Sequence, residues 1–496
     1  MTTRSISIIL AFVMLLSVVS CTSSSDSDAP GTTVPVADAP VNSPDISELY
    51  RERDDKLPEL DLGGQTIHFL TMKSNGITGE AYNDEIWVDE LKSEPLNDSI
   101  YNRNVYVMER LNCKITNEIY EAHELFPMFQ KAYGADEDIY QVIGFEAAPA
   151  LVHSFDGYFY NLKDLDTQYI EFDAPWWSSQ FFDEVATDEQ VYTLAGSLSL
   201  SMLRSIHVTY FNKNIAVDEG IEDLYNVVKE GRWTIDYQTE LCSGMYKDLN
   251  GDSERDLDDR YGYATSFYWA VDSYWSAFDI SILSRYDDRF EFDLNEEKAY
   301  DGMLKIYDLS YGDSAYGKWL EDFEVEEMFA NDGAFMITQK LSCVEIPLFR
   351  NMQSDYGIIP MPKFDQAQKE YYSMPFEIFQ TYMIPKTARD PDSISAVLEA
   401  LSAETWRKVI PTYSEIALKG KYLTDPQSRE MFDMVTGNTK IDAGLMYYSK
   451  INGIGAALYR YPIERNEPEE FASNLEKNKR RIKIYIDELN KEVFGE

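Results

Sequence analysis

Residues 138–146 read DIYQVIGFE, and this stretch decides the fold class because its apolar run is continuous rather than alternating. Continuous apolar character is typical of a strand that is buried on both faces of a sheet. A half-buried strand is predicted upstream, where GQTIHFLTMK (64–73) alternates apolar and polar residues. Between the two, residues 94–113 place apolar residues at helical spacing. Strands that alternate with helices in this way predict an α/β sheet covered by helices.

The same alternation continues along the chain. Further strands are predicted at 113–119, 190–196, 207–213, 333–339 and 355–362, and helices at 123–135, 393–410 and 471–493. The last helix carries an apolar stripe opposite a charged face. Its predicted buried residues are Phe471, Leu475, Ile482, Tyr485, Leu489 and Val493.

The N-terminus, MTTRSISIILAFVMLLSVVSC, has the size and flanks of a signal peptide, predicted at 1–20. Its apolar run is too short for a membrane span, which needs roughly 20 apolar residues. The end of the run resembles the lipobox of bacterial lipoproteins, so Cys21 is the expected site of lipidation. The alternative is an ordinary secretory signal with a chance cysteine. Residues 21–58, rich in Ser, Thr, Pro and Asp, predict a flexible tether with a reach of about 35 Å.

The composition fits a soluble exported protein. Hydrophobic residues make up 44% and aromatics 14%, which is enough for large cores. Lys+Arg 44 against Asp+Glu 87 gives a net charge of −43, which argues against nucleic acid and against membrane contact other than through a lipid anchor. Beyond Cys21, three cysteines without CxxC spacing indicate neither a zinc site nor a redox pair, and four scattered histidines form no metal motif.

Several segments agree, in order, with one protein family. They are ADEDIYQVIGF, GYFYNLKDLD, VYTLAGSLSLSMLRSIHVTYFNKNIA, GRWTIDYQTE, KDLNGD, DDRYGYA, FANDGAFMITQ, DYGIIPMPKFDQAQKEYYS and KYLTDPQSREMFDMV. Each is a weak signal alone. Their joint order behind a lipobox resembles the family 1 extracellular solute-binding proteins of bacterial ABC importers.

This resemblance implies an α/β, two-lobed, periplasmic-binding-protein-like (type II) fold with a hinge between the lobes, which the chain crosses near residues 200, 370 and 425. The implied organisation is lobe 1 at 59–200 and 371–425, lobe 2 at 201–370, and a helical part at 426–496 that packs mainly on lobe 2. The implied function is capture of a small solute, a sugar or oligosaccharide being favoured, and its delivery to ABC transporter permease subunits. The resemblance further implies a monomer without enzymatic activity at the extracellular face of the cytoplasmic membrane.

Sugar binding requires flat aromatic rings for the C–H faces and paired polar groups for the hydroxyls. Loops between strands and helices supply the candidate aromatic residues Trp176, Trp177, Trp269, Tyr274 and Trp275. Packing in the core is the competing interpretation for each of these rings.

The candidate polar residues are chosen by position. Glu146 and Gln339 end predicted strands, and Glu377, beside Phe376, lies near the expected second crossing. A surface or hinge hydrogen bond is the competing interpretation for each polar group. The ligand-binding residues of the family vary too much to be transferred by motif.

An acidic loop at 247–264, KDLNGDSERDLDDRYGYA, predicts a structural Ca²⁺ site. Read in an EF-hand-like register, its oxygen donors are Asp248, Asn250, Asp252, Glu254 (through its carbonyl), Asp256 and Asp259. Ser253 stands where the turn glycine is usual, and Asp259 is shorter than the usual bidentate Glu. A solvated turn is the alternative, and no cofactor is expected for function.

Two other function classes compete with a binding protein. A lipid-anchored glycoside hydrolase would also present aromatics and paired carboxylates in a cleft. A structural adhesin would predict repeats or long β-rich stretches, and the sequence has neither. GxSxG, HExxH and P-loop patterns are absent from the sequence.

Overall fold

The computed structural model describes residues 53–73, 84–267, 269–318, 323–419 and 426–495. The chain divides into two compact units, 1–45 and 46–496, and every described residue belongs to the second unit. The signal peptide, Cys21 and most of the tether predicted at 21–58 therefore lie outside the described residues. Within them, no helix is both long enough and apolar enough to cross a membrane.

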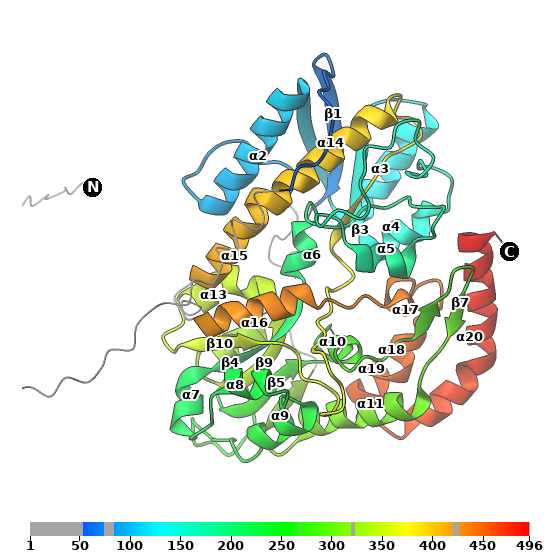
Figure 1. The fold of residues 1–496 in the computed structure, drawn as a ribbon. Helices are drawn as coiled ribbons and strands as arrows, with labels where there is room; N and C mark the ends of the chain where they lie inside the picture. The colour runs from blue at the N-terminus through cyan, green and yellow to red at the C-terminus, as the bar shows by residue number, and fades with distance from the viewer. Residues whose placement is uncertain (1–52, 74–83, 268, 319–322, 420–425, 496) are drawn as a thin grey trace, which may run out of the picture. The chain divides into compact units, whose positions relative to one another are not determined.

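The strands form two main sheets and one two-stranded ribbon, β6–β7 (Figure 1). In the first sheet, of order β11–β3–β1–β2, β1 is parallel to β2 and β3, and β11 is antiparallel to β3. In the second, of order β10–β4–β9–β5–β8, β5 is parallel to β8 and β9, whereas β4 is antiparallel to both neighbours. The strands are β1 (Gln65–Met72), β2 (Cys113–Tyr120), β3 (Val142–Glu146), β4 (His207–Asn212), β5 (Tyr261–Ser266), β6 (Leu283–Arg285), β7 (Phe290–Phe292), β8 (Ala315–Lys318), β9 (Ala334–Lys340), β10 (Tyr356–Ile359) and β11 (Gln380–Met383).

Helices cover both sheets. Those of the first half are α2 (Pro95–Leu111), α3 (Ala122–Gly134), α4 (Ala147–Ser154), α5 (Ser179–Val185), α6 (Leu200–Arg204), α7 (Lys213–Asp218), α8 (Leu224–Lys229) and α9 (Ile235–Cys242). Those of the second half are α10 (Trp269–Ala277), α11 (Glu296–Tyr311), α12 (Glu324–Ala330), η1 (Leu341–Glu345), α13 (Pro347–Arg350), α14 (Pro391–Glu404), η2 (Thr405–Val409), α15 (Ile410–Lys419), α16 (Pro426–Gly437), α17 (Ala443–Met446), α18 (Ile454–Leu458), α19 (Arg460–Glu464) and α20 (Glu470–Phe494).

Local sequence signals set the helix ends. The carboxylate of Glu94 accepts a hydrogen bond from the backbone N–H of Asn97, which caps α2, and Pro95 occupies the first turn. Asn112, in the left-handed conformation with φ 48°, ends the same helix. At α14 the Asp390 carboxylate caps the first turn in the same manner, and the helix continues through the π-helical turn η2 into α15.

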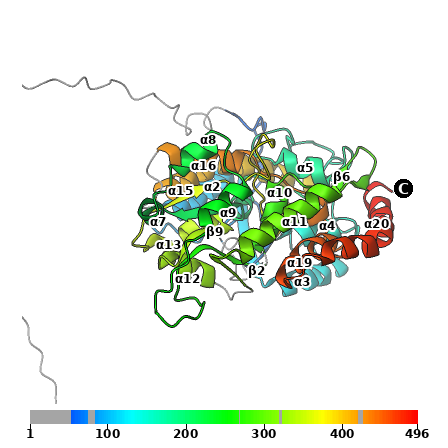
Figure 2. The ribbon, with the colours of Figure 1, turned by 90° about the horizontal axis from the view of Figure 1, so that it is seen from below.

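Each sheet has its own helical cover. Helices α2 and α3 pack on the first sheet, and α14 packs on α2. Helices α9, α11 and α12 pack on the second sheet, and Figure 2 shows α9 and α11 lying across it when it is viewed from below. We call the first sheet with its helices lobe 1 and the second sheet with its helices lobe 2. The α/β class predicted from the sequence is confirmed.

The chain passes from lobe 1 to lobe 2 between β3 and β4, and it returns between β10 and β11. The crossings predicted near residues 200 and 370 fall in these two intervals. The two segments pair with each other, because Ile206 forms an antiparallel bridge with Pro375. The third predicted crossing, near 425, adjoins residues 420–425, which lie outside the described residues. The lobe boundaries themselves stay predictions.

Two predictions about elements were wrong. Residues 190–196 do not form a strand, because their pairing with β11 is limited to one isolated bridge, Leu194 with Tyr382. In α20 the buried face contains Ile486, four residues after Ile482, whereas Tyr485 is half-buried. The four-residue step keeps Ile486 on the stripe of Ile482, and Tyr485 lies beside it.

Candidate functional site

The carboxyl ends of the parallel strands are the first place to search for a ligand site, because open α/β sheets bind ligands beyond those ends. In lobe 1 the last residue of β3 is Glu146, and in lobe 2 the last residue of β9 is Lys340. Glu377 lies in the returning segment, just before β11. Together with His207 and Phe376, these three residues form what we call the junction cluster.

Glu146 links β3 to α4. The four preceding residues of β3 are buried, and Glu146 is half-buried where the strand ends. Its side chain makes no capping bond to α4. Burial alone raises the pKa of Glu146 to about 7. At neutral pH this carboxyl therefore exists in both protonation states, and it can donate or accept a hydrogen bond.

Glu377 is held beside Glu146 by the pairing of β11 with β3. Gln380 is the register partner of Glu146, and the backbone N–H of Ala147 donates to Phe379 O at 2.9 Å. Burial raises the pKa of Glu377 to about 7, the Lys340 ammonium lowers it, and the Glu146 carboxylate raises it. Glu377 is therefore within electrostatic reach of the carboxyl-end residues of both lobes.

Lys340 and His207 close the cluster from lobe 2. The two residues are register partners on β9 and β4, and both are buried. Lys340 Nζ lies 5.1 Å from the centre of the Phe376 ring, and the His207 ring meets the same phenyl ring edge-on at 6.0 Å. Burial, and then Lys340, lower the pKa of His207 to about 3, so this imidazole is neutral. Its Nδ1 atom is buried and has no hydrogen-bond partner among the described residues.

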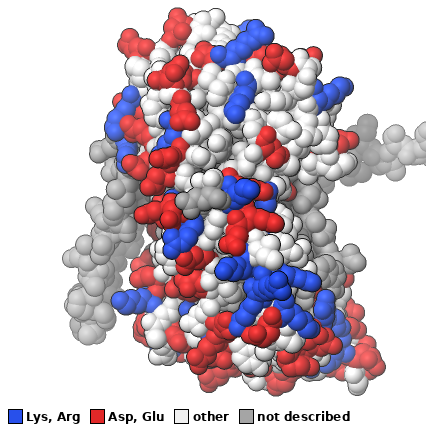
Figure 3. Space-filling model, turned by 90° about the vertical axis from the view of Figure 1, so that its right-hand side faces the viewer, with Lys and Arg blue, Asp and Glu red and all other residues white. Residues whose placement is uncertain are grey.

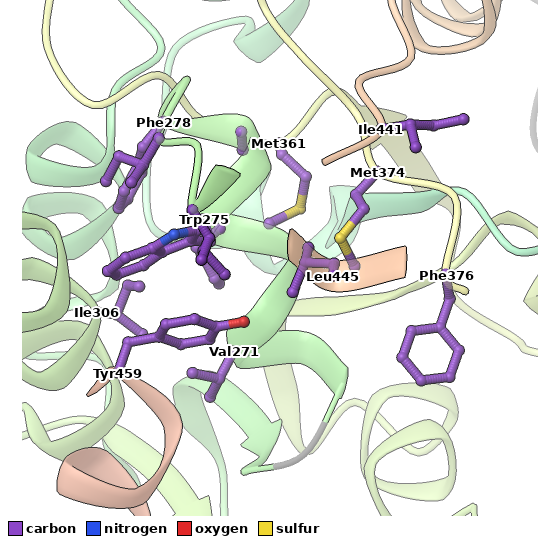
Figure 4. Close-up of a cluster of buried hydrophobic side chains, with 14 of the residues drawn as sticks. Val271, Trp275, Phe278, Ile306, Met361, Met374, Phe376, Ile441, Leu445 and Tyr459 are labelled. Carbon is purple, nitrogen blue, oxygen red and sulfur yellow. The ribbon is translucent and has the colours of Figure 1, made fainter. Parts of the chain in front are cut away.

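A stacked aromatic pair lies close to the cluster. The rings of Trp275 and Tyr459 are 4.1 Å apart and nearly parallel, and Figure 4 shows them one over the other. Both residues are fully buried. Trp275 Nε1 and Tyr459 Oη have no hydrogen-bond partner among the described residues. The pKa of Tyr459 is raised by burial and then by Glu377, which places its ring near the cluster. Sequence reasoning missed Tyr459, because nothing around it distinguishes it from a core tyrosine.

The other residues predicted for the ligand take different places. Tyr274 is fully buried, and its hydroxyl already bonds to Thr338 Oγ1 at 2.9 Å and to the Tyr263 hydroxyl at 3.0 Å. Gln339 is half-buried on β9, and its Oε1 atom accepts from the next backbone N–H. Trp269 begins α10, and its side chain is outside the described part of the structure.

Trp176 and Trp177 are joined to a buried carboxylate in lobe 1. The indole N–H of Trp176 donates to Glu399 Oε1 at 2.9 Å, and that of Trp177 donates to Oε2 at 2.8 Å. Burial raises the pKa of Glu399 to about 7 although both bonds favour its charged form. Gly196 lies against this pair, because a Cβ atom there would be 2.2 Å from the carbonyl oxygen of Trp176.

Both tryptophans line an open cavity of about 520 Å³ that also touches α6, η2 and α16. Its other lining residues include Ser197, Ser199, Trp406 and Asp433. No residue of the junction cluster lines this cavity, but the two adjoin each other, because the lining residue Ile206 precedes His207 and forms a bridge with Pro375, which precedes Phe376. The structure therefore distributes the predicted ligand residues over two places, with Glu146, Phe376 and Glu377 in the cluster and Trp176 and Trp177 at the cavity.

Two charged residues that sequence reasoning missed hold the crossing segments together. Glu85 is fully buried, and its carboxylate accepts hydrogen bonds from the Tyr382 hydroxyl at 2.7 Å, Gln380 Nε2 at 2.6 Å and the backbone N–H of Ser201 at 2.8 Å. These bonds join the chain after β1, strand β11 and the first crossing. Burial raises the pKa of Glu85 to about 7.

Arg204, at the end of α6, is the second of these residues. Its guanidinium donates two hydrogen bonds of 3.0 Å to Glu345 in lobe 2 and one of 3.1 Å to Asp84. The Arg204 side chain is 5% exposed, whereas those of Glu345 and Asp84 are 22% and 38% exposed, so these ion pairs are only partly shielded from solvent. The partners of Glu85 and Arg204 are distant in sequence, and no local motif marks them.

The acidic loop is closed by its own hydrogen bonds. Asp248 accepts from the backbone N–H groups of Gly251 at 2.6 Å and Ser253 at 3.0 Å. Asp259 is fully buried and accepts from the Tyr246 hydroxyl at 2.9 Å. Among the described residues, no group of three or more His, Cys, Asp or Glu side chains is placed to hold a metal ion. The predicted set also includes Asn250 and the Glu254 carbonyl, which are not side chains of these types, and the calcium site stays a prediction.

The fold can now be compared with solved structures. The sugar-binding protein MalE from Xanthomonas citri matches with a TM-score of 0.56 at 10% identity, over 86% of this chain and 98% of that chain. The substrate-binding protein Lmo0181 from Listeria monocytogenes, in complex with cycloalternan, matches with a TM-score of 0.53 at 12% identity, over 84% and 98%. The maltose/maltodextrin-binding domain MalE from Bdellovibrio bacteriovorus, bound to maltotriose, matches with a TM-score of 0.51 at 13% identity, over 84% and 100%.

The chain has the two-lobed type II fold of these binding proteins. This confirms the fold class that the resemblance implied. At identities this low the likeness establishes the fold and leaves the ligand open. No protein-family model matches the chain, and no curated protein matches it in sequence.

Proposed function

We propose that the protein captures a small solute, most favourably a sugar or oligosaccharide, between its two lobes, without chemical conversion. One observation carries the proposal. Glu377 lies against the end of β3, because the backbone N–H of Ala148 donates to its carbonyl oxygen at 3.4 Å, and it follows Phe376, whose ring centre lies 5.1 Å from Lys340 Nζ of lobe 2. The carboxyl ends of β3 and β9 therefore meet at this segment. Open α/β sheets and domain junctions are the preferred places for small-molecule sites.

The chemistry of the junction cluster suits a ligand with many hydroxyl groups. Glu146 and Glu377 can each accept or donate a hydrogen bond near neutral pH, because burial raises the pKa of both to about 7. A hydroxyl group needs a donor and an acceptor together, and two such carboxyls beside an ammonium group provide them. The solved proteins of the same fold include complexes with cycloalternan and with maltotriose, which supports a carbohydrate.

The glycoside hydrolase alternative is less well supported. Such an enzyme needs one protonated and one ionised carboxyl, so their environments must push the two pKa values apart. Burial is the largest cause of the raised pKa in both Glu146 and Glu377, so the two environments do not mark one carboxyl as the acid and the other as the base. Incubation with chromogenic glycosides checks this point, because a binding protein gives no turnover with any of them.

A thermal-shift screen over mono- and oligosaccharides, followed by calorimetry, tests the binding proposal. With the sugar that stabilises the protein most, Glu146→Ala and Glu377→Ala are each expected to weaken binding by about 1–3 kcal/mol, roughly 5- to 150-fold. Glu109→Ala, an exposed position on α2, is the matched control and leaves affinity unchanged. Unchanged affinity in both cluster variants would remove the cluster from the site.

The cellular setting is part of the same proposal. Cys21 carries lipid, the domain stays at the extracellular face of the cytoplasmic membrane, and the captured solute passes to an ABC transporter permease. The supporting observation is the lipobox-like run ending at Cys21, together with the fold. Labelling cells with a palmitate analogue checks the anchor, because Cys21→Ser would abolish the label on this chain. Persistence of the label in that variant would refute lipidation at Cys21.

A further inference from the structure

The densest run of basic residues in this acidic chain lies on α20. Residues 477–483 read KNKRRIK, so five of seven positions are Lys or Arg in a chain with 44 such residues in 496. A random window of this length would hold fewer than one. All five basic side chains are exposed. Figure 3 views the side on which α20 lies in Figure 1, and the largest of several groups of blue side chains lies in its lower half, bordered by acidic side chains.

Helical geometry places three of these cations on one outward face. Lys477, Arg480, Arg481 and Ile484 follow the spacing i, i+3, i+4, i+7, which lines up side chains along one side of a helix. The opposite stripe is buried, so α20 is fixed to the body and this face points to solvent. Ile484 lies at the end of the face and is 49% exposed. We call these four residues the basic face.

The three cations of the basic face form no ion pairs with other described residues of the chain. Lys479, which is not on this face, pairs with Glu476 and with Glu296 of α11. Lys477, Arg480 and Arg481 form no ion pair with any other described residue. The chain has a net charge of −43, yet these three exposed cations do not pair with its acidic side chains. Balancing nearby acidic residues therefore does not explain their position.

We infer that the basic face of α20 is a docking surface for an anionic lipid membrane. Each Lys or Arg close to an anionic lipid surface contributes favourably, and an exposed apolar side chain among the cations can enter the headgroup region. The net charge argues against membrane contact for the chain as a whole. It does not decide the local interaction, because charges more than about 10 Å away are largely screened at 0.1 M salt.

A membrane explains the basic face better than a second copy of the chain does. Two copies would bring together two bodies of net charge −43, and the apolar part of this face is a single isoleucine. A stable protein interface requires roughly 800 Å² from each partner with an apolar centre. The predicted anchor at Cys21 would bring the domain to the same lipid surface, so a weak contact is sufficient to orient it.

Vesicle co-flotation tests the inference. The chain from residue 21, carrying Cys21→Ser so that no lipid is attached, is mixed with vesicles of phosphatidylglycerol and phosphatidylcholine, or of phosphatidylcholine alone. We expect binding to the anionic vesicles only, and its loss at 0.5 M salt. No binding to anionic vesicles at low salt would overturn the inference.

Charge reversal locates the contact. The triple variant Lys477→Glu, Arg480→Glu, Arg481→Glu is expected to bind anionic vesicles on the order of 100-fold more weakly. The matched control reverses three exposed cations elsewhere, Lys92, Arg350 and Lys369, with the same change in net charge. An equal loss in both variants would overturn the inference, because the effect would then follow net charge alone.

Two further measurements separate the alternatives. Light scattering of the unmodified chain and the triple variant shows whether the basic face joins two copies, and a dimer broken by the substitutions would overturn membrane docking. The sugar-induced thermal shift is expected to be equal in both proteins. A protein that binds vesicles and no sugar would refute the proposed function and leave this inference standing.

Discussion

Replacing Glu399 by leucine tests how a buried carboxylate is tolerated beneath Trp176 and Trp177. The substitution leaves two buried indole N–H groups without acceptors, at a cost of about 1–3 kcal/mol each, or about 2–6 kcal/mol together. It also removes a carboxyl whose pKa rises from about 4.5 in the unfolded chain to about 7 in the folded one. Removing this carboxyl stabilises the protein by an amount that depends on pH, and this gain offsets part of the loss caused by the unpaired indole N–H groups.

The sign follows from proton binding. Between pH 4.5 and 7 the folded state holds more protons at Glu399 than the unfolded state does, so this group lowers stability progressively as pH rises. Linkage gives a destabilisation of about 1 kcal/mol at pH 5 and about 3 kcal/mol at pH 8. Leucine removes that contribution. Glu399→Leu is therefore expected to destabilise the protein by about 2 kcal/mol more at pH 5 than at pH 8.

Urea unfolding at the two pH values, followed by tryptophan fluorescence and by circular dichroism, measures the difference. Glu109→Leu, at an exposed position on α2, is the control and is expected to show the same small effect at both pH values. An equal loss for Glu399→Leu at pH 5 and pH 8 would refute the reasoning, because Glu399 would then titrate alike in the folded and unfolded chains.

Three more outcomes are expected from the structure. Arg204→Ala removes the hydrogen bonds that the buried guanidinium donates to Glu345 and Asp84, whose side chains are 22% and 38% exposed, and is expected to lower the free energy of unfolding by about 1.5–3 kcal/mol, measured by urea titration; a loss below about 0.5 kcal/mol would show that these ion pairs behave as solvent-exposed ones. Gly196→Ala forces a Cβ against the Trp176 carbonyl and is expected to lower Tm by several degrees, whereas Gly134→Ala, which meets nothing within 4 Å, is expected to leave Tm nearly unchanged; equal Tm values for the two variants would show that the contact relaxes. If the loop 248–259 holds Ca²⁺ as the sequence predicts, removing the ion with a chelator is expected to lower Tm, because the carboxylates of the loop would then repel one another; identical Tm values with Ca²⁺ and with chelator would favour a solvated turn.

The sequence predicts those elements whose formation depends on residues close together in the chain. The strand at 138–146 was predicted because burial on both faces requires a continuous apolar run, and the structure forms β3 at its end. The strand predicted at 190–196 failed because strand formation depends on the partner. Strand β11 pairs with β3 instead, and its described pairing with residues 190–196 is limited to the bridge between Tyr382 and Leu194.

Only part of the candidate site can be predicted from the sequence, because most of its contacts join residues that are distant in the chain. Glu146 was found because a strand end is visible in the sequence. Tyr274 was placed in a ligand-facing loop because it lies among aromatic residues, yet α10 packs it into the lobe 2 core, and composition cannot distinguish the two environments. Glu85 bonds to residues near 380, and such distant partners leave no local signal.

The position of β11 has a consequence for how the chain folds as it is made. All described strands of the lobe 2 sheet lie between residues 207 and 359, so that sheet can be complete before β11 is synthesised. In the lobe 1 sheet, one edge of β3 has no partner strand until residues 380–383, which form β11, have been synthesised. Lobe 2 can therefore form first, and an arrested or truncated chain ending before residue 380 would expose the β3 edge to other molecules, where it could start aggregation.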